Sequence, residues 1–160
     1  MALLGIISDT HDNRPLIGKA VEIFNSRGVG LVVHAGDFIA PFVARDFRAL
    51  KCPLVGAFGN NDGERKGLLR AFEGIGEIHQ GPHTFAHEGR RIAVMHEPDR
   101  LEEFLKPEYD LVVYGHTHKA EVREGRPLVV NPGEVGGWLY GRSTVVILDL
   151  DEMRAEVIEL

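Results

Sequence analysis

Three short apolar runs, each followed by a segment with helical spacing, constrain the first half of the chain. The runs lie at residues 3–7 ("LLGII"), 31–37 ("LVVHAGD") and 53–62 ("PLVGAFGNND"). Apolar residues at helical spacing predict helices over 16–24, 38–50 and 64–72. Strands that are apolar on both faces and alternate with helices belong to a mostly parallel sheet that is covered on both sides. The chain is therefore predicted to have an α/β fold.

The second half of the chain is richer in strands. Residues 83–97 have the pattern of two strands with a turn at 88–89, and a short helix is expected at 101–105. Further strand patterns occur at 110–115, within 120–134 and within 143–160, and the last of these ranges is expected to form a hairpin. No repeat or linker interrupts the sequence, so we expect a single domain over 1–160. The predicted architecture is a four-layer α-β-β-α sandwich, with two mixed sheets packed face to face and helices outside.

Composition and charge narrow the classes of function. A net charge of -6 argues against bulk binding of nucleic acid, which needs clustered Lys and Arg. Cys52 is the only cysteine, which excludes an intrachain disulfide and a cysteine zinc cluster and fits a reducing compartment. The first apolar run follows no basic segment and ends near Asp9, so we expect neither a signal peptide nor a membrane span. We therefore expect a cytoplasmic protein.

Polar side chains follow five of the predicted strands. An isolated His-x-His pair such as His116 and His118 is more often an exposed loop feature than a ligand pair, so its meaning depends on the other strand ends. Ligands of α/β sheets bind beyond the carboxyl ends of the strands, where such side chains can converge. The candidates are Asp9, His11, Asp37, Asn60, His96, His116 and His118.

This set of donors predicts a centre with two metal ions. The seven carboxylate, imidazole and amide groups are too many for one tetrahedral zinc ion but suit two five- or six-coordinate ions. Asp37 lies between two groups of candidates along the chain, which makes it the natural bridging ligand. The absence of thiolates favours two divalent ions among Mn, Ni, Fe, Co and Zn, with manganese preferred, over a calcium cage.

The order of these motifs resembles the signature of a known family. "DTH", "GD", "GNND", the histidine at 96 and "GHTH" resemble the five blocks of the calcineurin-like metallophosphoesterases. The short chain is similar to their small stand-alone phosphodiesterase branch, to which a retromer subunit of the same fold is related. The similarity runs from Leu4 to about Gly133. It implies that the first metal is held by Asp9, His11, Asp37 and His118, and the second by Asp37, Asn60, His96 and His116.

The resemblance implies an enzyme that hydrolyses a small-molecule or nucleotide phosphodiester by in-line attack of a metal-bridging hydroxide. The candidate catalytic residues are Asp37, Asn61 and His96. Many larger family members have histidine where this chain has Asn61, and an amide cannot protonate a leaving group. We therefore expect slow cleavage of poor leaving groups. Two alternatives are a non-catalytic metal-binding scaffold like the retromer relative and a metal hydrolase of amides or esters.

Several other residues have simpler interpretations. His34 lies inside a strand and is predicted to be structural. Asn13 caps a helix or, together with Arg14, contacts substrate. We expect a tight turn at Asn131 to Gly133 and a pocket rim following Glu134. Surface positions are expected for His79, His83 and His87, and core or interface positions for Trp138 and Tyr140. A homodimer or higher homo-oligomer is one expectation for the assembly.

Overall fold

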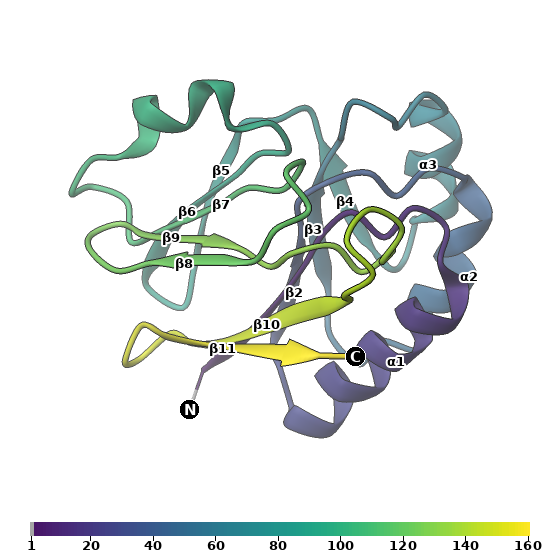
Figure 1. The fold of residues 1–160 in the computed structure, drawn as a ribbon, viewed down its shortest axis with the longest axis horizontal. Coiled ribbons are helices and arrows are strands. Elements are labelled where there is room, and N and C mark those ends of the chain that lie inside the picture. The colour runs from purple at the N-terminus through teal and green to yellow at the C-terminus, as the bar shows by residue number, and fades with distance from the viewer. Residues whose placement is uncertain (1) are drawn as a thin grey trace.

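Two β-sheets packed face to face form the centre of the molecule (Figure 1). The computed structural model describes residues 2–160, and Met1, the first residue of the predicted domain, lies outside this part. Within residues 2–160, no helix is both long enough and apolar enough to cross a membrane.

The first sheet has six strands in the order β11-β10-β1-β2-β3-β4. Its strands are β1 (Leu3–Ile7), β2 (Leu31–His34), β3 (Leu54–Ala57), β4 (Gly76–His79), β10 (Thr144–Asp149) and β11 (Arg154–Glu159). Strands β1 to β4 are parallel, while β10 is antiparallel to both β1 and β11. The carboxyl ends of β1, β2 and β3 therefore lie side by side along one edge.

The second sheet has five strands in the order β5-β6-β7-β9-β8. They are β5 (His83–His87), β6 (Arg90–Val94), β7 (Leu111–Val113), β8 (Glu121–Arg123) and β9 (Leu128–Asn131). The central strands β6, β7 and β9 are parallel, and an antiparallel strand lies at each edge. Both sheets are thus mixed, as predicted.

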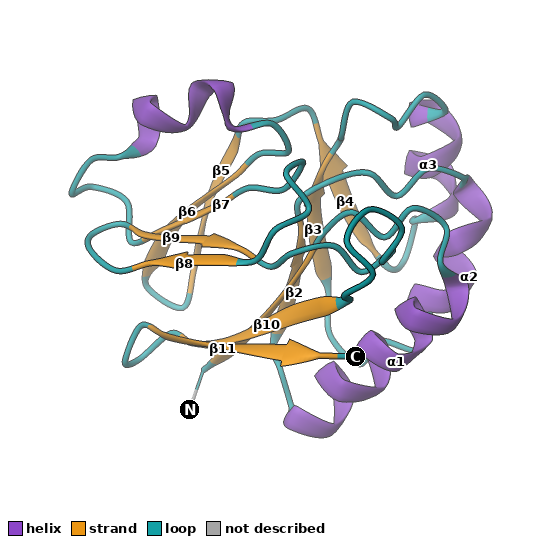
Figure 2. Ribbon diagram, in the orientation of Figure 1, coloured by secondary structure: helices purple, strands orange, loops and turns teal. Residues whose placement is uncertain are grey.

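Helices form the two outer layers (Figure 2). The six-stranded sheet is covered by α1 (Arg14–Arg27), η1 (Pro41–Val43), α2 (Ala44–Phe47) and α3 (Arg65–Ala71). Within the described residues, the five-stranded sheet is covered by one 3-10 helix, η2 (Pro98–Phe104), whose Leu101 belongs to the same apolar cluster as Met95 and Tyr109. The predicted four-layer sandwich is confirmed, although its fourth layer is only one short helix.

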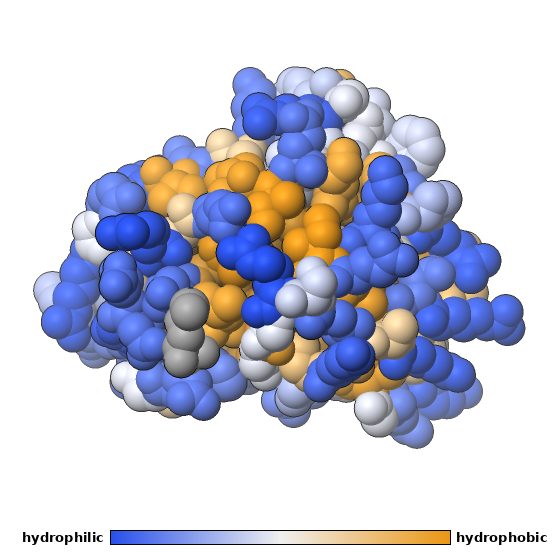
Figure 3. All heavy atoms as spheres, turned by 90° about the horizontal axis from the view of Figure 1, so that it is seen from below, coloured by the Kyte–Doolittle hydropathy of each residue, from blue (hydrophilic) through white to orange (hydrophobic). Residues whose placement is uncertain are grey.

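The period-two alternation of strand side chains divides the core. In β1, Leu4 and Ile6 face the second sheet, whereas Ile7 packs with the phenylalanines under the helices. Figure 3, viewed from below, shows a band of apolar residues between polar margins, as expected at the end of a sandwich. Because each fully buried large apolar side chain contributes about 1.5–3 kcal/mol, both apolar layers stabilise the edge that carries the polar strand ends.

Two elements differ from the sequence prediction. The helix expected over 38–50 is helical only from Pro41 to Phe47, because Ile39 has a φ of 85° that no right-handed helix contains. Strand β4 was not predicted, since its four residues include only one fully buried apolar side chain, Ile78. It forms by parallel pairing with β3.

His34 is a structural residue, as its position inside β2 predicted. Its ring is fully buried and stacks on Phe38 with 3.6 Å between ring centroids. The Gly36 N–H donates to Nδ1 (3.0 Å), so Nε2 carries the ring proton and lies 3.2 Å from Thr10 Oγ1. Burial lowers the pKa of His34 to about 3. The ring is therefore neutral and links β2 to the loop after β1.

Glycine at position 5 is required by the packing of α1 on β1. A Cβ atom there would lie 2.8 Å from the Phe24 ring. We expect Gly5→Ala to lower the free energy of unfolding by about 1–3 kcal/mol, because a packed core cannot accept the added methyl group. Gly18→Ala is the control: it lies in α1, its Cβ would meet no atom within 4 Å, and it should stabilise by about 0.5–1 kcal/mol. Urea unfolding of both variants measures the difference, and equal effects would contradict this account.

The second prediction concerns His34. His34→Ala should lower the free energy of unfolding at pH 7 by roughly 3 kcal/mol, as for other large-to-small changes in cores. The pKa of His34 is about 3 when folded and 6.5 when unfolded, so the unfolded chain takes up the proton first. The stability that neutral His34 contributes is complete above pH 6.5 and is lost as the pH falls toward 3. The gap between wild type and variant should therefore be smaller at pH 5 than at pH 7 in urea unfolding, and a constant gap would contradict the assignment.

Candidate metal centre

The five polar strand ends meet at one edge of the sandwich. Asp9 and His11 follow β1, Asp37 follows β2, and Asn60 follows β3 in the first sheet; His96 follows β6, and His116 and His118 follow β7 in the second. The structure thus brings all seven candidate ligands together from both sheets.

The loops that carry these residues have an uncommon backbone. Five of the seven have a positive φ: Asp9 (51°), His11 (42°), Asp37 (64°), His116 (72°) and His118 (65°). Residues other than glycine rarely adopt this conformation, and it concentrates at functional sites that are held by surrounding contacts. These turns bend each side chain back toward the shared edge.

One group of side chains gathers around Asp9. Its Oδ1 lies 3.3 Å from His118 Nε2 and 3.7 Å from His11 Nε2. Asp9 Oδ1 and His11 Nε2 are buried without a hydrogen-bond partner. Buried polar atoms are nearly always satisfied, so these orphaned atoms fit a cation that completes the site. The three residues lie close enough to share one ion.

A second group gathers around Asp37. Its Oδ2 lies 3.2 Å from His11 Nε2 and 3.3 Å from His96 Nε2, so it contacts histidines of both groups. His116 Nδ1 in turn lies 3.4 Å from His96 Nε2 and 3.2 Å from Asn60 Oδ1. Continuous contacts therefore link the two groups through Asp37.

The electrostatics of the centre favour bound cations. Burial alone would raise the pKa of Asp37, but contacts with His11 and His96 hold it well below its usual range. The pKa of Asp9 is also lowered, since contacts with His11 and nearby histidines outweigh its burial. Contact with Asp37, and then with Asp9, raises the pKa of His11 to about 10. Two ionised carboxylates thus attract positive charge, and a metal ion that binds His11 must displace its proton.

Neighbouring groups fix the ligand atoms. His96 Nδ1 lies 2.8 Å from the Ala35 carbonyl oxygen, which can only accept, so Nε2 is free to face Asp37. The Asp62 carboxylate accepts from the backbone N–H groups of Asp37 (2.9 Å), Ile39 (2.8 Å) and Gly59 (2.8 Å). A Cβ at Gly59 would lie 2.1 Å from Asp37 Oδ1, so only glycine fits there. These contacts hold the Asp37 loop in place.

Asn61 contacts Asp37 directly. Its backbone N–H donates to Asp37 Oδ1 (3.0 Å), and its side-chain amide donates to Oδ2 (2.9 Å). Asn61 therefore lies beside the candidate ligands, as its position directly after Asn60 in the sequence indicated. Its amide group still lacks a proton that can be transferred.

Glu134 contributes more than the sequence indicated. Its carboxylate is fully buried and lies 3.5 Å from His118 Nδ1. It also accepts from the backbone N–H groups of Leu139 (3.1 Å) and Tyr140 (3.0 Å). A carboxylate behind a histidine ligand commonly orients the ring. The only sequence signal was its position just after the buried strand β9.

Asn13, Arg14 and the turn at 131–133 make contacts within the protein. The Asn13 side chain accepts from the Leu16 N–H (3.4 Å) and caps α1, while Arg14 pairs with Asp46 (2.9 Å). The turn at 131–133 is confirmed, because the Gly133 N–H donates to Asn131 Oδ1 (2.9 Å).

Rings outside the centre lie at the surface. Of the two alternatives for Trp138 and Tyr140, the core position is wrong, since their exposed fractions are 71% and 53%, and the interface position stays a prediction. They lie in a loop that the buried Glu134 holds from beneath. The expected surface positions of His79, His83 and His87 are confirmed: all three are half-buried on the edge strands β4 and β5, and His79 stacks on His83.

Comparisons with known proteins identify the family to which the chain belongs. The model of the calcineurin-like phosphoesterase superfamily domain matches residues 2–153. Phosphodiesterase MJ0936 of Methanocaldococcus jannaschii is 40% identical over 164 residues, which cover 98% of this chain and 99% of that protein. A solved archaeal phosphodiesterase is 38% identical with a TM-score of 0.93 and 99% of both chains covered. Vps29 of Chaetomium thermophilum, at 16% identity and a TM-score of 0.71, covers 99% of this chain and 94% of its own and shares the fold. The chain belongs to the calcineurin-like phosphoesterase superfamily.

Proposed function

We propose that this protein is a phosphodiesterase that uses two divalent metal ions to hydrolyse a small-molecule or nucleotide phosphodiester. The observation that carries this proposal is the position of Asp37 Oδ2 between His11 (3.2 Å) and His96 (3.3 Å), where one carboxylate can serve two ions. The 40% identity with a phosphodiesterase over nearly all of both chains supports a diester substrate.

The contacts support a division of the ligands into two sets. His11 and His118 both face Asp9, whereas His116 contacts Asn60 and His96. Asp9 Oδ1 also lies 3.9 Å from His96, but it is closer to His118. The proposed first set is Asp9, His11, Asp37 and His118, and the second is Asp37, Asn60, His96 and His116.

The chemistry of the donors determines which ions fit. Carboxylate, amide and imidazole donors without thiolate suit manganese and the neighbouring divalent ions. Two such ions, when bound, would supply an activated water molecule and neutralise charge on the phosphoryl oxygens. The protein contributes a fixed arrangement: Asp37 stays ionised, the Ala35 carbonyl fixes the His96 ring, and Asn61 donates to Asp37.

A non-catalytic scaffold is the weaker interpretation. A protein that used the strand ends only for interaction would have no need to keep seven metal-binding side chains within contact of one another. The orphaned buried Oδ1 of Asp9 favours a bound ion over a bare interaction surface. Turnover of a diester separates an enzyme from a scaffold that also binds metal.

The first functional prediction tests metal dependence. After chelation, added Mn²⁺ should restore hydrolysis of bis(p-nitrophenyl) phosphate far more than of p-nitrophenyl phosphate or p-nitrophenyl acetate. Asp37→Ala should lower the metal content from about two ions per chain and abolish turnover, because both ions lose a ligand. Elemental analysis and initial rates measure both effects.

Asp151→Ala, an exposed aspartate between β10 and β11, is the control and should retain both metal and activity. Full metal content in Asp37→Ala would disprove the bridging role. Preferred turnover of the acetate ester would point instead to a carboxyl-ester hydrolase.

The second functional prediction concerns proton delivery. Because the Asn61 amide cannot protonate a leaving group, kcat/KM should fall steeply as the pKa of the leaving alcohol rises. Asn61→His should flatten this dependence by supplying a proton donor. Asn61→Ala removes the side-chain contact with Asp37 Oδ2, keeps the backbone N–H contact with Oδ1 and adds no donor, so it separates the two roles. Rates for a series of aryl and alkyl diesters give the slope, and a flat wild-type slope would mean that another group donates the proton.

A further inference from the structure

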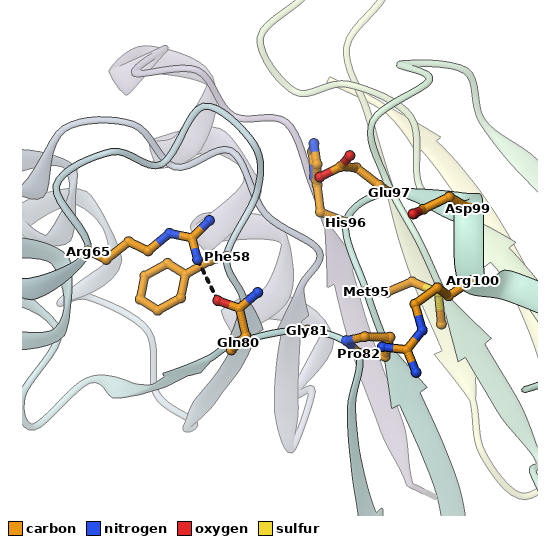
Figure 4. A pocket seen from close by; sticks show the side chains of 10 residues that line it. All are labelled: Phe58, Arg65, Gln80, Gly81, Pro82, Met95, His96, Glu97, Asp99 and Arg100. Atoms are coloured by element: carbon orange, nitrogen blue, oxygen red, sulfur yellow. Dashed lines mark hydrogen bonds between the residues drawn. The ribbon is translucent and has the colours of Figure 1, made fainter. Parts of the chain in front are cut away.

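A polar pocket opens beside the metal centre and shares His96 with it (Figure 4). Its walls come from both sheets: Phe58 and Arg65 from the β3 side, Gln80 from the β4–β5 loop, and residues after β6. The cavity volume is about 200 Å³. Sites for whole drug-sized ligands are about 300–1,000 Å³, so this pocket fits one substituent of a substrate.

One wall of the pocket consists of hydrogen-bond donors. The Arg65 guanidinium lies over the Phe58 ring (4.9 Å) and donates to neutral oxygens: the carbonyls of Asp62 (3.0 Å) and Gly59 (3.3 Å) and Gln80 Oε1. These contacts fix the guanidinium but use only part of its five N–H groups. Gln80 accepts through its oxygen, so its NH₂ group remains available as a donor.

The opposite wall presents acceptors. Glu97 and Asp99 line the pocket across from Arg65 and Gln80 in Figure 4. Arg100 also lines this wall, but its guanidinium pairs with Glu103 through Nε (2.8 Å) and Nη2 (2.9 Å) rather than with Glu97 or Asp99. The two carboxylates are thus left to accept hydrogen bonds from a ligand.

We propose that this pocket binds a hydroxylated substituent of the phosphodiester, such as a glycerol unit or a pentose. A hydroxyl group both donates and accepts, so neighbouring hydroxyls satisfy a donor wall and an acceptor wall at once. A second phosphate could pair with Arg65 and Arg100 but would also lie against the carboxylates of Glu97 and Asp99, and an acyl chain would leave both walls unsatisfied. The inference rests on the proposed function, because it places the substituent next to a phosphorus atom at the metal centre.

Three diesters with the same p-nitrophenyl leaving group test the proposal: the glycerol ester, a ribonucleoside 5′-ester and the n-propyl ester. The shared leaving group keeps the chemical step comparable, so the ratio of kcat/KM to that of the propyl ester reports the pocket alone. We expect a ratio of about ten or more for a hydroxylated ester, as one or two buried hydrogen bonds provide. The ester with the higher ratio identifies the source of the hydroxyl groups.

Asp99→Ala changes the acceptor wall and Gln80→Leu the donor wall. Each variant should lower the ratio of kcat/KM for the hydroxylated ester to that for the propyl ester about tenfold. Glu102→Ala is the matched control, since Glu102 lies on the same helix η2 but outside the pocket, and its ratio should equal that of wild type. Equal kcat/KM for all three esters in the wild type, or unchanged ratios in both pocket variants, would overturn the proposal. If no diester were hydrolysed, including bis(p-nitrophenyl) phosphate, the proposed function itself would fail.

Discussion

The structure depends on the burial of two carboxylates at the edge where the two sheets meet. Asp9 is fully buried and Asp37 is 1% exposed, and both face the histidines of the neighbouring strand ends. Two ionised carboxylates out of water are costly unless positive charge lies beside them. His11 meets that need when its pKa rises to about 10, and divalent ions would meet it more completely. The site therefore attracts cations as a consequence of its fold.

Holding these groups together imposes conditions on the backbone. The turns at Asp9, Asp37 and His116 have a positive φ, which costs energy for residues with a side chain. The rest of the fold compensates: Asp62 binds three backbone N–H groups around the Asp37 loop, and the Ser8 hydroxyl donates to Asp9 (2.6 Å). The apolar layers on both sides of the first sheet anchor the strands from which these loops start.

The two flanks of the centre differ in chemistry. On the His96 side lies the small polar pocket with its donor and acceptor walls. Near His11, the Trp138 indole N–H donates to the His11 carbonyl oxygen (3.4 Å), which places an exposed aromatic loop near the centre. Glu134 joins this loop to His118, so one buried carboxylate contacts both a proposed metal ligand and the rim. A diester has two substituents, and this asymmetry offers each of them a different surface.

The sequence by itself determined the alternation of strands and helices and the order of the polar strand ends. Apolar runs such as residues 3–7 and 31–37 have a local pattern, and the position of Asp37 just after a buried strand already indicated a ligand. It also predicted a structural His34, because a histidine inside an apolar strand is buried with the strand. The local pattern did not reveal strand β4, which forms by pairing with β3. It also did not reveal that the helix after Asp37 begins late, because the Asp62 carboxylate accepts from the Ile39 N–H. Only the tertiary structure decided that Glu134 supports His118 and that Arg65 faces Asp99 across a pocket. The residues of each pair are far apart in the chain, and the spacing of apolar residues does not indicate which distant loops come together.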